Sequence, residues 1–271
     1  MDLLKQTKGE TDVTNKQRPE YFDAFDQLKI DRDESDGVLT VRMHTRGGPC
    51  VFSLPFVAQC VEALHRIGSD PDNRVLIWTG TGTEWMSGPD FASFGDVGNP
   101  NRWDAVSRNV RKALVSMLDL DMPIVSAVNG PAHLHSEWIL THDIVLATPQ
   151  VSFCDRPHLA FGIVPGDGMH VLWTEALGAS RARYFLWMQE VMAAETAQSL
   201  GVVHELVAQQ DLDGRAAAVA KHLASQPTLN LRYTRQALTQ RLKRLLLEGL
   251  GHGLALEGLT AVDLARRQSS K

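Results

Sequence analysis

The chain has 271 residues, of which 44% are hydrophobic and 22% are charged, and its formal net charge at pH 7 is -5. These values are ordinary for a soluble globular protein with one large core or two small domains. The negative charge gives no reason to expect a nucleic acid or an anionic membrane surface as a partner.

The cellular compartment is predicted from the cysteines and from the N-terminus. Cys50, Cys60 and Cys154 have neither metal-ligand nor disulfide-framework spacing, which is typical of a reducing compartment. No apolar run approaches the roughly 20 residues of a membrane-spanning helix. Residues 1–20 are polar and lack the apolar core of a signal peptide, so we expect a mobile tail and a cytoplasmic protein.

Strand-like and helix-like segments alternate from residue 21 to residue 226, which predicts an α/β core. The residues after about 170 are mostly helical in pattern, and residues 227–271 form a predicted C-terminal helical region. Its leucines, among them Leu242, Leu246 and Leu250, cover a wide face that we expect to pack against another subunit. In chain order, strands are predicted over 38–44, 74–78, 123–128, 143–147, 151–153 and, more weakly, 202–207, and helices over 54–67 and 103–118.

Two glycine-rich stretches differ in what they predict. Thr79 to Gly82 follows a strand but lacks the Lys-Ser/Thr of a phosphate-binding P-loop, so a plain turn is favoured. Pro165 to Gly168 places the carboxylate of Asp167 in a tight loop, where it can be aimed at a neighbour or can simply be solvated.

Histidines gather in predicted loops that leave the ends of strands, where α/β folds place their chemistry. His158 and Asp167 are nine positions apart, and a returning chain would bring them into contact. Asp167 would then fix the tautomer of His158 and leave its other nitrogen as a general base. A structural histidine is the alternative. A zinc site built from His133, His135 and His142 is less favoured, because no further ligand completes it, and we expect no metal.

The same segments resemble the crotonase (enoyl-CoA hydratase/isomerase) superfamily from about residue 39 to residue 207. The resemblance implies a crotonase-like spiral of ββα units with a C-terminal helical region that forms a trimer, often a dimer of trimers. Its landmarks are Arg74-Val-Leu-Ile-Trp-Thr-Gly80, Ser87-Gly-Pro-Asp-Phe91, Pro123-Ile-Val-Ser-Ala-Val-Asn-Gly130, Asp143-Ile-Val-Leu-Ala147 and Phe161-Gly-Ile-Val-Pro-Gly166.

Departures from the family pattern affect the predicted chemistry. Family enzymes stabilise a thioester oxyanion with two backbone N–H groups, and one of these positions is Pro89 here, which has no N–H. The other lies in a Gly-Gly-Gly loop, which is replaced by His133-Leu-His-Ser136. Losing one such donor typically costs about 3 kcal/mol of transition-state stabilisation. Ordinary acyl-CoA chemistry is therefore expected to be impaired.

The pattern of His135, His158 and Asp167 resembles the β-diketone hydrolases related to 6-oxocamphor hydrolase. The resemblance implies that His158 and Asp167 activate water, that His135 binds a carbonyl oxygen, and that Glu257 lies near the site. A tryptophan that lines the site in those enzymes is Phe52 here. The candidates for substrate-binding residues are Phe52, Phe91, Phe94, Trp138 and Glu257, and Glu137 has either a catalytic or a helix-capping role.

The sequence thus predicts hydrolytic cleavage of a carbon–carbon bond in a small-molecule β-diketone, without a cofactor. Two alternatives stay open. One is an acyl-CoA hydratase, isomerase or thioester hydrolase that uses His158. The other is a non-catalytic scaffold of the same fold.

Overall fold

The central strands of the protein are apolar on both faces, as expected of a parallel sheet that is covered on both sides. The computed structural model describes residues 18–269. All five residues of β4 (Val75–Thr79) and of β6 (Ile124–Val128) are buried. Alternate residues along each strand therefore belong to two separate cores, one on each face of the sheet.

The main sheet has the strand order β1-β2-β4-β6-β7-β10. β1 and β2 are antiparallel, and the remaining neighbours are parallel. Two small two-stranded sheets, β3-β5 and β8-β9, stand away from it. The strands are β1 (Leu28–Asp33), β2 (Val38–Met43), β3 (Val51–Phe52), β4, β5 (Gly88–Pro89), β6, β7 (Ile144–Ala147), β8 (Ser152–Phe153), β9 (Met192–Ala193) and β10 (Glu205–Leu206).

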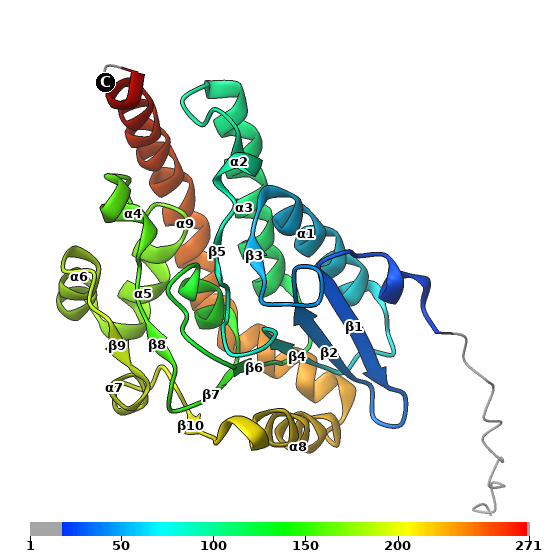
Figure 1. Cartoon of the computed structure of the whole chain (residues 1–271). Helices are drawn as coiled ribbons and strands as arrows, with labels where there is room; N and C mark the ends of the chain where they lie inside the picture. Colours follow the sequence, from blue (N-terminus) through cyan, green and yellow to red (C-terminus); the bar gives the residue numbers. More distant parts are fainter. Residues whose placement is uncertain (1–17, 270–271) are drawn as a thin grey trace, which may run out of the picture.

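The helices cover the two faces of the sheet unequally (Figure 1). One face carries α8, whose alanines pack against Val75, Ile77 and Val125. The other face carries the larger core, in which α1, α3, α5 and α9 take part. The helices are α1 (Leu54–Ser69), α2 (Phe91–Phe94), α3 (Pro100–Asp119), α4 (Pro157–Phe161), α5 (Met169–Leu177), α6 (Ala179–Trp187), α7 (Ala194–Ser199), α8 (Leu212–Ala224) and α9 (Thr228–Ser269).

Most predicted elements are confirmed within a few residues, and the differences have physical causes. β1 was not predicted, since only Leu28 and Ile30 of its first four residues are apolar; these two are buried. Of the predicted tail, residues 1–17 lie outside the described residues. Arg18, which was included in the predicted tail, donates hydrogen bonds to Asp31 and to the carbonyl oxygen of Ile30.

The predicted C-terminal helical region is a single continuous helix of 42 residues, α9. Leu246 and Leu250, which were expected to face another subunit, are buried in the chain's own core. The outer side of α9 exposes other leucines, Leu238, Leu247 and Leu259. Trimer formation through this region stays a prediction.

By length and composition alone, α9 is also long and apolar enough to cross a membrane, with a mean hydropathy of 1.2 over 18 residues. No apolar run of this length was expected from the sequence. Core helices of soluble proteins pass the same test, and Leu246, Leu250 and Leu254 bury one face of α9 in the core. Packing within this chain therefore accounts for one face of the helix, because 39% of the apolar window is buried.

Close backbone contact holds the Asp167 loop against α9. A Cβ atom on Gly166 would lie 2.1 Å from the carbonyl oxygen of Gly253, and one on Gly253 would lie 2.2 Å from His170 Cε1 and 2.3 Å from the Gly166 oxygen. His170 lies between the two segments, with Nδ1 3.1 Å from the carbonyl oxygen of Pro165 and Nε2 3.3 Å from that of Gly249. Only glycine allows this approach.

Replacement of Gly253 by alanine is expected to lower the free energy of unfolding by about 1–3 kcal/mol, the usual cost of overpacking. Gly251→Ala is the matched control, because a Cβ atom there meets nothing within 4 Å on the same helix. It should raise stability by about 0.5–1 kcal/mol, since alanine favours helices more than glycine does. Denaturant unfolding of both variants checks the pair, and equal effects would contradict the close contact.

Candidate active site

The candidate site is a cavity of about 430 Å³ with apolar walls and one charged end. Its lining comes from strand β3, from helices α2, α3 and α4, and from the C-terminal half of α9. The charged end consists of His135, His158, Asp167 and Glu257. The apolar lining includes Phe52, Pro89, Phe91, Phe94, Trp103, Val106, Val110, Leu134, Phe161, Ile163, Leu254 and Ala261.

His135 reaches the cavity through an unusual backbone conformation. It has φ 49° and ψ 43°, the left-handed region, which is sparsely populated by residues other than glycine. Its ring lies over Phe52, with 3.7 Å between the ring centroids. The strained residue therefore directs an imidazole into the place where the family pattern has a glycine loop.

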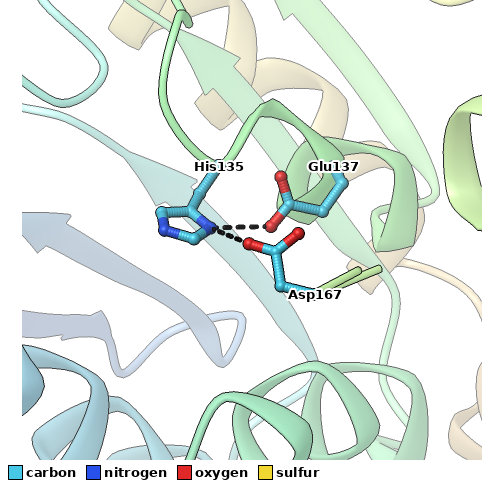
Figure 2. Close-up of side chains that lie close together, drawn as sticks. All are labelled: His135, Glu137 and Asp167. Atoms are coloured by element: carbon cyan, nitrogen blue, oxygen red, sulfur yellow. Dashed lines mark hydrogen bonds and ion pairs between the residues drawn. The ribbon is translucent and has the colours of Figure 1, made fainter. Parts of the chain in front are cut away.

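Two buried carboxylates converge on one nitrogen of His135 (Figure 2). Nδ1 lies 2.9 Å from Glu137 Oε1 and 3.3 Å from Asp167 Oδ2. Because Nδ1 is engaged in this way, Nε2 is the nitrogen left to donate to another group. Glu137 is fully buried at the start of a 3₁₀ helix, Ser136–Thr141, so its role is to bind His135 and not merely to cap a solvated helix end.

Three carboxylates lie near the ring nitrogens of His158, of which only Asp167 was predicted from the sequence as its partner. Nδ1 lies 2.7 Å from Asp155 Oδ1, whereas Nε2 lies 3.5 Å from Asp167 Oδ2 and 3.8 Å from Glu257 Oε1. The expected contact between His158 and Asp167 is present. However, the carboxylate that fixes the tautomer through Nδ1 is Asp155, three residues earlier, and Asp167 faces the reactive nitrogen instead.

Burial and mutual charge set the protonation of this cluster. Burial lowers the pKa of His158, but the charge of Asp167 and the hydrogen bonds to the carboxylates outweigh it and hold the pKa well above the ordinary histidine value. The pKa of His135 is likewise raised, since Glu137 and Asp167 together overcome burial. Burial raises the pKa of Asp167 less than the two histidines lower it, so Asp167 is ionised.

The other two acids of the cluster titrate near neutrality. Burial raises the pKa of Glu137 to about 7, assisted by the negative charge of Asp167 and opposed by His135. Burial also raises the pKa of Glu257 to about 7, opposed by its interaction with the nearby His158. The cluster therefore contains both proton donors and proton acceptors at neutral pH.

The predicted site residues divide into those that line the cavity and one that does not. Phe52, Phe91, Phe94 and Glu257 line it, together with the three predicted catalytic residues. Trp138 does not; it is fully buried behind Phe52 and stacks on Phe56, with 6.0 Å between ring centroids. Trp138 is therefore a supporting core residue.

Sequence reasoning missed Asp155 and Trp103. Asp155 could have been found from its spacing, because an acid three residues before His158 across a short helical turn lies on the same side of that turn. Trp103 was not among the predicted site residues; it lines the cavity and donates its indole N–H to the carbonyl oxygen of Leu254. The sequence holds no signal that separates an aromatic residue that lines a cavity from one that only packs.

Within the described residues, two groups of side chains could hold a metal ion. These are His135 with Glu137 and Asp167, and His158 with Asp167 and Glu257. The combination weighed from the sequence is not among them. His133 is bound to Ser152 at 2.8 Å, and His142 is buried elsewhere beside Trp78.

This fold and site define a member of the crotonase superfamily. The enoyl-CoA hydratase/isomerase family model matches residues 33–259, so the chain belongs to that family. A probable peroxisomal enoyl-CoA hydratase 1 from Arabidopsis thaliana is 28% identical over 236 residues, which cover 83% of this chain and 82% of the relative. An enoyl-CoA hydratase/isomerase from Mycobacterium paratuberculosis, 22% identical with a TM-score of 0.80, shares the fold.

A more similar protein is a β-diketone hydrolase from the cyanobacterium Anabaena sp. PCC 7120, whose structure holds (S)-3-oxocyclohexyl acetic acid. It is 54% identical, with a TM-score of 0.90, and the match covers 92% of this chain and 99% of that one.

The buried acid Glu137 makes a testable contribution to stability. Its pKa in the folded protein is raised from 4.5 to about 7, so the folded state favours the protonated form. The contribution of protonated Glu137 to the free energy of unfolding is fully present below its pKa in the unfolded chain. It is lost as the pH rises through its pKa in the folded protein. Glu137→Gln should remove this loss, which is at most about 3 kcal/mol.

Denaturant unfolding at pH 5 and pH 8 measures the effect. The decrease in unfolding free energy between these pH values should be smaller in Glu137→Gln than in the wild type. Glu248→Gln, on the exposed surface of α9, is the control and should retain the wild-type decrease. An unchanged pH dependence in Glu137→Gln would show that Glu137 is not buried as an acid.

Proposed function

We propose that the protein is a cofactor-independent hydrolase that cleaves the carbon–carbon bond between the carbonyls of a cyclic or bicyclic β-diketone, giving a keto acid by a retro-Claisen reaction. The observation that carries this proposal is the arrangement of His135, His158 and Asp167 at the charged end of an apolar cavity. The site acts in the cytoplasm, and a trimer or a dimer of trimers is the assembly that the family resemblance implies.

The substrate class follows from the shape and chemistry of the cavity. Phe52, Phe91 and Phe94 offer a hydrocarbon surface to a compact ring system, and the charged end offers hydrogen bonds to its carbonyls. The ligand of the Anabaena enzyme supports a bicyclic substrate. Joining the carboxyl carbon of that acid to the distant ring carbon next to its ketone gives a bridged bicyclic 1,3-diketone, which we propose as the model substrate.

The first chemical step is the attack of water on one carbonyl carbon. Asp155 binds the Nδ1–H of His158, which leaves the lone pair of neutral His158 on Nε2. Nε2 removes a proton from water while the water oxygen forms its bond to carbon. The resulting oxyanion is stabilised by the Nε2–H of His135, whose own positive charge is held by Glu137 and Asp167.

The second step breaks the carbon–carbon bond. The tetrahedral intermediate collapses, and the electron pair passes to the carbon between the two carbonyls, where the second carbonyl delocalises it as an enolate. His158, now protonated at Nε2, returns its proton to that carbon. One water is consumed for each keto acid formed, and no metal or organic group takes part.

The alternative chemistry of an acyl-CoA hydratase, isomerase or thioester hydrolase has support from the family membership. Pro89 argues against it. This residue lines the cavity in β5, and it lacks the backbone N–H that a thioester oxyanion would need there. A non-catalytic scaffold would leave the strain of His135 and the buried charge cluster without a purpose.

The function is tested with the bridged bicyclic diketone, by following loss of diketone and appearance of keto acid in the absence of any cofactor. His158→Ala should lower kcat/KM by about 10²–10⁴-fold, the usual contribution of a positioned base. Asp167→Asn should also cause a large loss, whereas His65→Gln, on the exposed side of α1, should not.

Circular dichroism of each variant establishes that it is folded. Full activity in a folded His158→Ala protein would refute the proposed base.

The pH profile of kcat/KM tests how the carboxylates control His158. The pKa of His158 is raised, and only the deprotonated ring is a base. The rise of kcat/KM with pH should therefore have its midpoint above the ordinary histidine value of about 6.5. Glu257→Gln removes a group that raises this pKa, so the midpoint of the rise in kcat/KM should move to lower pH. An unchanged midpoint, measured over pH 5 to 10, would contradict the contact between Glu257 and His158.

A further inference from the structure

One ligand atom each of His158, Asp167 and Glu257 lies within 4.8 Å of the other two, close enough to share a metal ion. His158 Nε2 lies 3.5 Å from Asp167 Oδ2 and 3.8 Å from Glu257 Oε1. Three ligand atoms that each bind zinc at roughly 2.0–2.1 Å in tetrahedral geometry are separated by about 3.4 Å. The observed spacings are close to this value, and they exceed the length of a normal hydrogen bond.

The surroundings of His158 also match those of a metal-bound histidine. Its other nitrogen, Nδ1, lies 2.7 Å from Asp155, and metal-ligating histidines almost always donate their second N–H to a carboxylate or a carbonyl. This partner orients the ring and makes Nε2 a better ligand. Asp155 is 2% exposed, so the interaction is protected from water.

Carboxylate oxygens in the cluster lack protein partners. Asp167 Oδ1 and Glu257 Oε2 are buried and accept no hydrogen bond from the described residues. The two histidines face Oδ2 of Asp167, so the partnerless Oδ1 of this buried side chain is the oxygen left over for a cation. The lack of partners for these buried oxygens supports a ligand independently of the distances between His158 and the carboxylates.

We propose that His158, Asp167 and Glu257 form a binding site for a divalent transition metal ion, zinc in particular, with its fourth position open to the cavity. An imidazole with two carboxylates suits zinc, whereas calcium and magnesium are held by oxygen ligands alone. The neighbouring group around His135 is a poorer site, because its Nδ1 lies only 2.9 Å from Glu137 in a hydrogen bond.

A zinc ion at this position would inhibit the enzyme. It occupies the lone pair of His158 Nε2, which is the base of the proposed function, and it neutralises Asp167. Inhibition therefore rests on the proposed hydrolase activity, but the binding of zinc does not. The two are measured separately, so that failure of one is distinguishable from failure of the other.

Binding is measured by titrating zinc into the full-length, chelator-treated protein in competition with a chromogenic chelator. One tight site per chain is expected. His158→Ala should remove it, and Asp155→Asn should weaken it by about 10–100-fold, the usual effect of losing the partner of a ligating histidine. His65→Gln is the control for adventitious surface binding and should leave the tight site unchanged.

Anomalous scattering from zinc-soaked crystals of the wild type locates the ion without any variant. A peak bonded to His158, Asp167 and Glu257 supports the proposal. No tight binding, a tight site that survives in His158→Ala, or a peak at other residues would overturn it. In the activity arm, one equivalent of zinc should abolish diketone turnover and a chelator should restore it. Turnover that continues with the site filled would overturn the inhibitory role alone.

Discussion

The candidate site depends on one buried carboxylate that two histidines share. Asp167 Oδ2 lies 3.3 Å from His135 Nδ1 and 3.5 Å from His158 Nε2, and the side chain is almost entirely shielded from water. An isolated carboxylate in this position would be protonated, because burial strongly disfavours its charge. The two imidazoles reverse that preference. Each of the three groups therefore has the protonation state that the other two impose.

The fold supplies this arrangement through backbone features that are costly in isolation. His135 occupies the left-handed region, and the Asp167 loop lies against α9 so closely that Gly166 and Gly253 tolerate no side chain. The same contact brings Glu257 of α9 to His158. Strain and close packing of this kind are found where function requires a fixed geometry, and the large core beneath the sheet stabilises it.

Local signals predicted the α/β core and the central pair of the site, whereas the crotonase-like spiral was implied by the family resemblance. Buried strands are continuous apolar runs, and the loop between His158 and Asp167 is short enough to return. Asp155 was missed although its spacing was visible, because the sequence does not distinguish it from Asp167 as the partner of His158 Nδ1. The position of Trp138 behind Phe52, and that of Trp103 in the cavity wall, depend on which way an aromatic ring turns in three dimensions.

The C-terminal region shows a second limit of prediction from the sequence. Gly249, Gly251, Gly253 and Gly258 lower helix propensity within about ten residues, which favours a broken helix. Instead α9 is continuous, because three of these glycines pack against His170, Val171 and Trp103 at distances that a Cβ atom would not allow. Tertiary packing decides here against local propensity, and it is this helix that delivers Glu257.

The central claim is that this site has exchanged thioester chemistry for the hydrolysis of a carbon–carbon bond. It is tested most directly by the ratio of kcat/KM for the bridged bicyclic diketone to that for a short enoyl-CoA thioester, measured on the same preparation without added cofactor. The account predicts a large ratio in favour of the diketone, since Pro89 removes a donor from the thioester oxyanion while His135 and His158 serve the ketone. Efficient hydration of the thioester with no turnover of the diketone would contradict it.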